Sequence, residues 1–136
     1  MSYSSSRFYT NVIQNFKGGN YDAGLRALTS YRIYRTTAAS FRKIYNMIVP
    51  VLDRIISSSN VDSRTLIRLH IIIEYQKNRN VIDEDLANGI KQALDEIRNA
   101  RDPKQARKLA ETLRDSLDAF LAYVIYGGRR GEEEWL

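Results

Sequence analysis

The sequence predicts an all-α protein, a compact bundle of about five helices with short connections. Apolar residues recur at helical spacing along most of the chain, and the alternating β-branched runs that indicate strands are missing. Only two prolines and seven glycines interrupt this pattern. With 136 residues, of which 43% are hydrophobic, the chain is expected to form a single helical domain over 1–136, with 129–136 as a flexible tail.

The first 27 residues are expected to form an N-terminal extension that contains a short helix over roughly 7–16. A polar loop that holds Gly18, Gly19 and Gly24 follows this helix. The first long helix is predicted to begin at Thr29 or Ser30, because either hydroxyl can serve as N-cap, and to end near residue 57. Its predicted apolar stripe comprises Ile33, Phe41, Ile44, Ile48, Leu52 and Ile55.

Three further helices complete the predicted bundle. One begins at Asp62 or Ser63, and it is predicted to be the central helix because apolar residues surround most of its circumference. The next covers about 83–99 and carries acidic residues in its first turn, where the helix dipole favours them. The last begins with Asp102 as N-cap and Pro103 at its first position, a placement that suits both residues.

Positive charge is concentrated in the first part of the chain. Residues 1–80 carry 12 Lys or Arg against 4 Asp or Glu, a net charge of +8, whereas residues 81–136 carry 9 against 12, a net charge of −3. A basic surface attracts the phosphate backbone of nucleic acids through counterion release, largely independently of base sequence. The first part of the chain is therefore expected to contact RNA or DNA.

The candidate contacts lie on the first long helix and on the helix after it. On the first of these helices, four cations fall within an arc of roughly 100° opposite the apolar stripe: Arg32, Arg35, Arg42 and Lys43. Almost no acidic residue lies on that face. A solvated helix face also carries charge, so it is the single sign of the charge that favours binding. The candidate RNA-binding residues are Arg32, Arg35, Arg42, Lys43, Arg64, Arg68, Lys77 and Arg79.

Four tyrosines lie among these charges. Their rings could stack on bases, although a half-buried tyrosine is more often part of a core. These residues are Tyr31, Tyr34, Tyr45 and Tyr75.

The composition argues against several other classes of protein. The chain has no cysteine and one histidine, which excludes a disulfide framework and a Cys-ligated zinc site, so we expect neither a metal nor another cofactor. The sequence shows no Gly-rich phosphate loop and no nucleophile elbow. It also has no signal peptide and no apolar stretch near the ~20 residues that cross a bilayer, so we expect a cytoplasmic protein without a membrane partner.

An alternative function is that of a small helical endoribonuclease. Arg64 and His70 have the Arg-x(4 to 6)-His spacing of a family of such enzymes, in which Arg stabilises phosphate charge and His acts as acid or base. Six positions on a regular helix correspond to 240° of rotation, so the two side chains converge only if the helix is broken or a partner chain supplies one of them. His70 also lies in an apolar run, where a hydrogen-bonded core histidine is the usual case.

Three segments carry a resemblance to a known family. They are Leu-Thr-Ser-Tyr-Arg-Ile at 28–33, Glu-Tyr-Gln-Lys-Asn-Arg-Asn at 74–80 and Leu-Ala-Tyr-Val-Ile-Tyr-Gly-Gly at 121–128. In order and spacing they resemble the Leu-Thr-Thr-Ser-Gln-Ile-Arg, Ala-Tyr-Gln-Ala-Gly-Arg and Ala-Tyr-x-x-x-Tyr-Gly-Gly segments of the small helical subunit of the type III-A CRISPR effector, the Csm complex. This chain departs from the family at Tyr34, where the family has Arg, and at Asn78, where it has Gly.

The resemblance implies a non-catalytic subunit in antiviral defense, present in several copies along the duplex of guide RNA and target RNA. Its implied partners are these two RNAs, other subunits of the effector complex and copies of itself in a stacked array. By position, the resemblance implies Arg79 and Lys77 as RNA contacts, with Arg32 and Arg35 in place of the shifted family Arg. A subunit repeated along arbitrary sequence must bind without reading bases, and phosphate contacts supply affinity of that kind.

Overall fold

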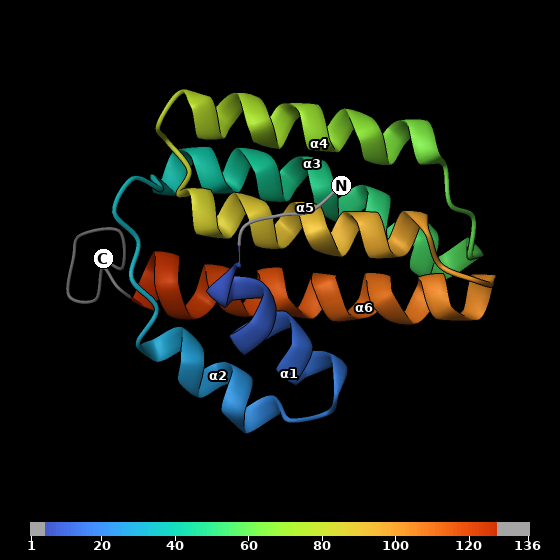
Figure 1. The fold of residues 1–136 in the computed structure, drawn as a ribbon, viewed down its shortest axis with the longest axis horizontal. Helices are drawn as coiled ribbons and strands as arrows, with labels where there is room; N and C mark the ends of the chain where they lie inside the picture. Colours follow the sequence, from blue (N-terminus) through green and yellow to red (C-terminus); the bar gives the residue numbers. More distant parts are fainter. Residues whose placement is uncertain (1–4, 128–136) are drawn as a thin grey trace.

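A computed structural model describes residues 5–127 of the chain. Within this range every regular element is a helix, as the sequence predicts (Figure 1). The π-helical segment η1 continues directly into α1, and α6 continues directly into the π-helical segment η2. The elements are η1 (Phe8–Ile13), α1 (Gln14–Lys17), α2 (Tyr21–Thr29), α3 (Ala38–Ser58), α4 (Ser63–Asn78), α5 (Glu84–Arg98), α6 (Pro103–Phe120) and η2 (Leu121–Tyr126). The expected tail over 129–136 lies outside the described residues.

The four longer helices α3 to α6 run side by side, and helices that follow one another along the chain are antiparallel (Figure 1). As a result, α3 and α5 begin at the same end of the bundle at which α4 and α6 finish. The helices η1, α1 and α2 pack against one another, and η1 also packs against α5. No helix of the described residues is both long and apolar enough to cross a membrane.

Two predicted helix starts are confirmed by their caps. The carboxylate of Asp62 accepts the backbone N–H of Arg64 at 3.1 Å, and that of Asp102 accepts the N–H of Gln105 at 2.8 Å. Pro103 occupies the first turn of α6, where its missing N–H costs nothing. In both cases the capping side chain and the amide that it accepts are no more than three residues apart in sequence. A local sequence pattern is therefore enough to predict these two starts.

The predicted start of the first long helix is wrong. Thr29 and Ser30 end α2 instead, and residues 30–37 form a loop before α3 begins at Ala38. The N-cap is Thr37, whose hydroxyl accepts the backbone N–H of Ser40 at 3.1 Å. Contacts from a distant part of the chain hold the loop out of the helix, as described for the candidate interface below.

All of residues 30–37, which the sequence assigns to the first long helix, therefore lie in this loop, including Arg32, Ile33 and Arg35. Ile33 is half-buried but takes no part in the stripe of α3, whose buried positions are Phe41, Ile44, Ile48, Leu52 and Ile55. Arg32 and Arg35 are exposed. The helical arc of positive charge that the sequence predicts does not include them.

Two glycines allow the N-terminal helices to pack closely. Gly24 lies within α2 and not in a loop, and a Cβ there would approach the ring of Phe16 to 2.4 Å. A Cβ at Gly89 in α5 would lie 2.7 Å from Oγ of Ser6 and 3.1 Å from the backbone nitrogen of Tyr9. The expected N-terminal extension is thus packed into the body of the bundle.

The core contains an aromatic cluster that joins four segments of the chain. Phe120, at the end of α6, is fully buried, and its ring centroid lies 5.5 Å from that of Phe8 and 4.8 Å from that of Phe41. The ring of Tyr31, in the loop, lies 5.8 Å from that of Phe120. This cluster connects η1, the loop, α3 and α6 at the end of the bundle where the loop lies.

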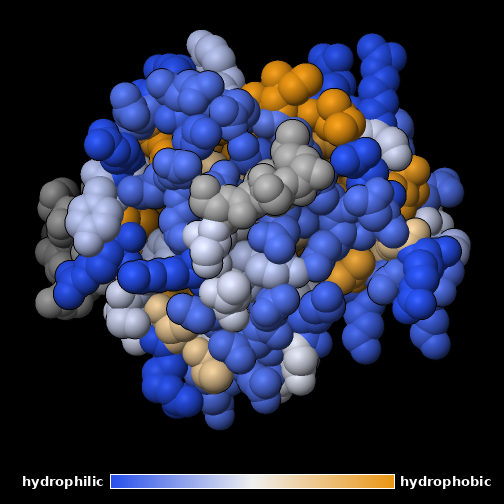
Figure 2. Space-filling model, viewed as in Figure 1, coloured by the Kyte–Doolittle hydropathy of each residue, from blue (hydrophilic) through white to orange (hydrophobic). Residues whose placement is uncertain are grey.

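The helix predicted to be central is an outer helix. Ile71 of α4 is 62% exposed and Ile67 is 39% exposed, and Figure 2 shows apolar surface along the edge where α4 lies. The helix with the more continuous burial is α5, which packs against η1, α4 and α6. Apolar residues around a helix indicate how much surface can be buried, but they do not specify which neighbours cover it.

Candidate nucleic-acid interface

Six of the eight predicted RNA-binding residues gather at one end of the bundle. This is the end at which α3 and α5 begin and α4 finishes (Figure 1). Two residues come from the loop over 30–37, two from the start of α3 and two from the end of α4. We call these six residues, Arg32, Arg35, Arg42, Lys43, Lys77 and Arg79, the basic end.

The other two predicted residues do not join this group. Arg64 and Arg68 are exposed in the first half of α4, and α4 begins at the opposite end of the bundle (Figure 1). They flank the exposed Ile67 along the same helix. The charges that the sequence places in one group therefore separate into two.

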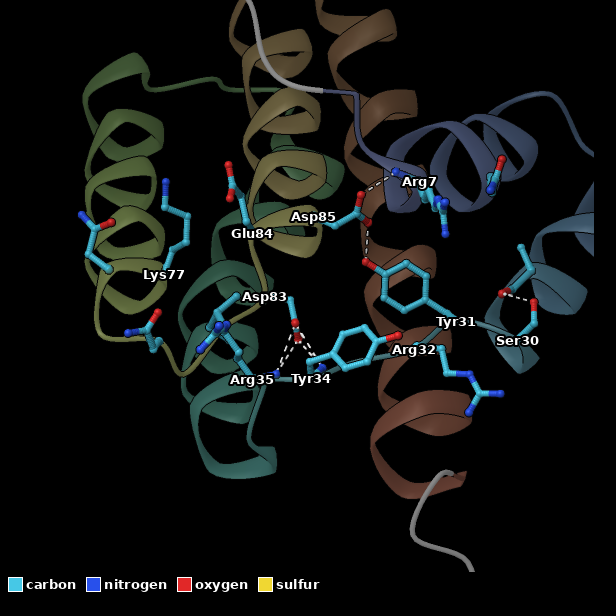
Figure 3. A pocket seen from close by; sticks show the side chains of 15 residues that line it. Arg7, Ser30, Tyr31, Arg32, Tyr34, Arg35, Lys77, Asp83, Glu84 and Asp85 are labelled. Carbon is cyan, nitrogen blue, oxygen red and sulfur yellow. Dashed lines mark hydrogen bonds between the residues drawn. The ribbon is translucent and has the colours of Figure 1, made fainter.

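A hollow of about 940 Å³ opens at the basic end. The loop, the start of η1, the end of α4 and the start of α5 surround it. In Figure 3, Tyr34 lies between Arg35 and Arg32, with Lys77 and Arg7 on opposite sides of the hollow. Its charged lining residues are the cations Arg7, Arg32, Arg35 and Lys77 and the acids Asp83, Glu84 and Asp85.

Asp83 holds the loop in place. Its carboxylate accepts the backbone N–H groups of Tyr34, Arg35 and Thr36 at 3.0 to 3.2 Å and the hydroxyl of Thr36 at 2.6 Å. The hydroxyl of Thr36 in turn accepts the backbone N–H of Asp83 at 2.9 Å. Burial raises the pKa of this carboxyl, but the hydrogen bonds from Thr36 and the loop amides outweigh burial, so its pKa lies below the usual value.

Asp85 holds the N-terminal segment in a similar way. Its carboxylate accepts the backbone N–H of Arg7 at 2.7 Å and that of Phe8 at 3.0 Å, so it satisfies free donors at the start of η1. It also accepts the hydroxyl of Tyr31, and burial together with this bond raises the pKa of that phenol. The two aspartates thus bind backbone amides and hydroxyls, and neither forms an ion pair with an arginine within residues 5–127.

Most of the basic end is consequently free of ion pairs. Among the described residues, only Lys77 of these six cations has a carboxylate partner, with its Nζ 3.1 Å from Glu74. Two arginines lie over aromatic rings instead: Arg42 is 5.7 Å from the ring centroid of Tyr126, and Arg79 is 5.8 Å from that of Tyr75. A guanidinium group over a ring can still donate from its edge to phosphate. In Arg79 one of these donors, Nη1, is used by Oε1 of Gln76 at 3.3 Å.

The four tyrosines divide into two pairs. Tyr31 and Tyr45 are half-buried, and their hydroxyls donate to Asp85 and Asp118, so both belong to the fold. Tyr34 is 83% exposed and Tyr75 is 61% exposed. Both exposed rings lie at the end of the bundle that carries the basic end.

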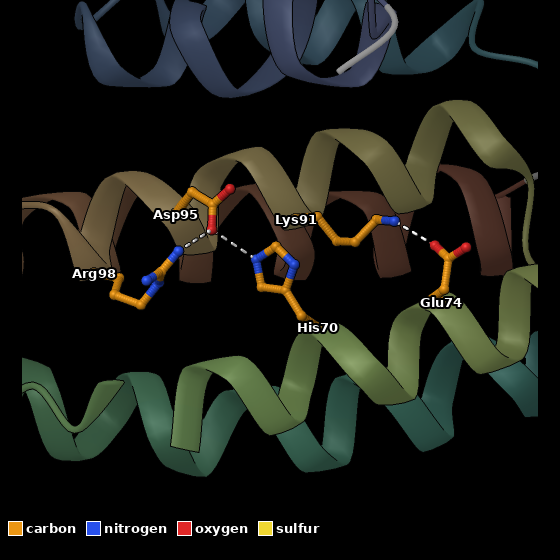
Figure 4. Close-up of polar contacts among 5 residues, drawn as sticks. All are labelled: His70, Glu74, Lys91, Asp95 and Arg98. Atoms are coloured by element: carbon orange, nitrogen blue, oxygen red, sulfur yellow. Dashed lines mark hydrogen bonds and ion pairs between the residues drawn. The ribbon is translucent and has the colours of Figure 1, made fainter. Parts of the chain in front are cut away.

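His70 lies between α4 and α5 (Figure 4). Its Nε2 is 2.9 Å from Oδ1 of Asp95, which also pairs with Arg98 at 3.2 Å. Burial lowers the pKa of the imidazole, and the charge of Asp95 opposes that shift. Because α4 is an unbroken helix over Ser63–Asn78, Arg64 projects from another side, and the ribonuclease alternative gains no support from this arrangement.

A second polar contact joins the same two helices. Lys91 is almost fully buried in α5, and its ammonium group contacts Glu74 of α4 (Figure 4). The hydrogen bonds from Lys91 and Lys77 lower the pKa of Glu74 to about 2. These pairs fix α4 against α5, which is a structural role.

Comparison of the chain with protein-family models, with curated proteins and with solved structures finds no match. The properties of the basic end are therefore drawn from its own geometry. The sequence pattern predicts all six cations of the basic end but not the roles of Arg7, Asp83 and Asp85, which line the hollow beside them. The sequence does show Asp83 and Asp85, as an acidic first turn of the helix now identified as α5. That turn by itself indicates only a favourable interaction with the helix dipole.

Proposed function

We propose that this chain is a non-catalytic RNA-binding subunit of a type III-A CRISPR ribonucleoprotein that acts in antiviral defense in the cytoplasm. It contacts guide RNA and target RNA through the sugar-phosphate backbone, without base specificity. The resemblance of three segments to the Csm small subunit supports the assembly. The observation that supports RNA binding is the basic end, where five of six cations lack an ion pair among the described residues.

The charge at the basic end favours backbone contact over a deep anion pocket. Four cations and three carboxylates line the hollow, so its interior is only weakly positive. The excess of positive charge lies outside the hollow, on the exposed side chains of Arg42, Lys43 and Arg79. Exposed arginines that contact phosphate supply affinity that depends on salt and carries no sequence information.

The proposal includes contacts with copies of the same subunit. We place these contacts on α4, where Ile67, Ile71 and Tyr75 follow one another at intervals of four residues and are all exposed. Residues at this spacing lie along one face of a helix. Arg64 and Arg68 border this apolar row, so we assign them to a protein neighbour and not to RNA.

Replacing Arg32, Arg35 and Arg42 together by glutamine should weaken binding to a labelled single-stranded RNA about tenfold or more at ~100 mM salt. The loss of three phosphate contacts should also reduce the steepness of the plot of log affinity against log salt concentration. The magnitude of the slope should fall by about 2, because each contact to a single strand contributes roughly 0.7. Fluorescence anisotropy at four salt concentrations measures both quantities.

The matched control removes three charges from the opposite end of the bundle. Arg101, Lys104 and Lys108 are exposed around the start of α6, and replacing them by glutamine changes the net charge by the same amount. This control should keep most of the affinity and the salt slope of the unmodified protein. Equal losses in the two triple variants would show that only net charge matters, and would refute an interface at the basic end.

A further inference from the structure

We propose that Tyr34 is a stacking platform for an unpaired base of single-stranded RNA, beside backbone contacts made by Arg32 and Arg35. This inference rests on the RNA-binding function proposed above and adds to it a preference for unpaired over paired nucleotides. Base stacking on an aromatic side chain tolerates any base, so it is compatible with binding that ignores sequence.

The exposure of Tyr34 sets it apart from the neighbouring aromatic residue. Tyr31, three positions earlier, is packed against Phe8 and Phe120, and its hydroxyl donates to Asp85. Tyr34 is 83% exposed, and the residues described here offer its ring no aromatic contact and its hydroxyl no hydrogen bond. The fold therefore makes no use of this ring, and both of its faces remain accessible.

The backbone that carries the exposed ring is firmly held. The N–H of Tyr34 donates to the carboxylate of Asp83 at 3.1 Å, and the next two residues donate to the same group. At the end of the loop, the N–H of Thr37 donates to the carbonyl of Val81 at 3.2 Å. Since the loop is already fixed, binding a base costs little backbone entropy, as expected of a preorganised site.

The neighbouring charges suit a nucleotide. Arg32 and Arg35 are exposed, have no carboxylate partner among the described residues, and lie on either side of the Tyr34 ring (Figure 3). A base on the ring would bring the phosphates on its two sides near these guanidinium groups. A positively charged surface with an aromatic platform is the usual combination for single-stranded nucleic acids.

A short single-stranded RNA that contains one 2-aminopurine tests this proposal, because the fluorescence of this base falls when it stacks. Tyr34→Ala should weaken affinity about tenfold, the scale of one stacked base, and should reduce the quenching. It should leave the salt slope unchanged, since no charge is lost. Tyr34→Phe keeps the ring and should bind as the unmodified protein does.

Two controls separate stacking from other effects. Tyr21→Ala removes a ring that is 58% exposed at the start of α2, which lines a different hollow, and it should leave affinity unchanged. When the same RNA is held in a perfect duplex, Tyr34→Ala should bind it almost as tightly as the unmodified protein does. If Tyr34→Ala binds the single strand with unchanged affinity and quenching, stacking is refuted and backbone binding stands. If the unmodified protein binds no RNA, both proposals fall.

Discussion

Replacing Phe120 by alanine should lower the free energy of unfolding by about 4 kcal/mol, the usual cost of removing a fully buried aromatic ring. The ring contacts Phe8, Tyr31 and Phe41, which belong to three other segments of the chain, so no single element can move to fill the cavity. Urea unfolding followed by circular dichroism measures this loss. In thermal unfolding it corresponds to a fall in the melting temperature of roughly 15 °C.

Tyr123 provides the control for this substitution. It lies one turn beyond Phe120 and is 46% exposed, so Tyr123→Ala removes a ring of similar size from a site that leaves no closed cavity. The expected loss is about 1 kcal/mol or less. A loss below about 1 kcal/mol for Phe120→Ala would mean that the cluster does not join the four segments.

Replacing Asp83 by alanine should lower the free energy of unfolding by about 2–3 kcal/mol, because the amides of residues 34–36 lose a charged acceptor. Hydrogen exchange measured residue by residue should locate the effect. The amides of Tyr34, Arg35 and Thr36 should exchange much faster in the variant. Amides in the middle of α6 should exchange faster only by the factor that the loss of global stability predicts.

Glu84→Ala is the matched control, since Glu84 is the adjacent exposed acid and makes no hydrogen bond or ion pair with the described residues. It should cost no more than about 0.5 kcal/mol.

Folding lowers the pKa of Asp83, so stability should depend on pH through this group. Its contribution to the free energy of unfolding is present above the unfolded pKa of 3.8 and is lost as pH falls through the lower folded pKa. If the difference in free energy of unfolding between the unmodified protein and Asp83→Ala stayed constant below that pH range, the role assigned to the carboxylate would be contradicted.

The parts of the fold that the sequence predicts correctly depend on local interactions. Asp62 and Asp102 cap their helices through amides within three positions, and Pro103 fits only the first turn of a helix. These signals lie inside a short window of sequence, as does the 3.6-residue spacing of apolar side chains. They suffice to predict an all-α bundle and the starts of α4, α5 and α6.

The errors arise where distant residues decide the local structure. Thr29 and Ser30 are acceptable N-caps, but Asp83 binds the amides of residues 34–36 from 47 to 49 positions away and so holds the segment as a loop. No pattern within residues 28–40 contains that information. The position of α4 was misjudged for a similar reason, since the sequence does not show which of its apolar faces a neighbour covers.

The candidate interface was predicted in part. The sign of the charge identifies the segments that form the basic end, because the cations of 1–80 have few acidic residues near them in sequence. Folding then brings two aspartates from the acidic part to the basic end. Asp83 binds amides of the loop and Asp85 binds amides at the start of η1, and neither pairs with an arginine among the described residues. Arg64 and Arg68 share the positive sign of this group, but the length of α4 separates them from it.

The most direct test of an RNA interface at the basic end is an NMR titration of the ¹⁵N-labelled protein with two short single-stranded RNAs of equal length and unrelated sequence. Our account predicts that both RNAs shift the same amides, in the loop over 30–37, at the start of α3 and at the end of α4. Shifts centred on the start of α6, or shifts that differ in place between the two sequences, would contradict it.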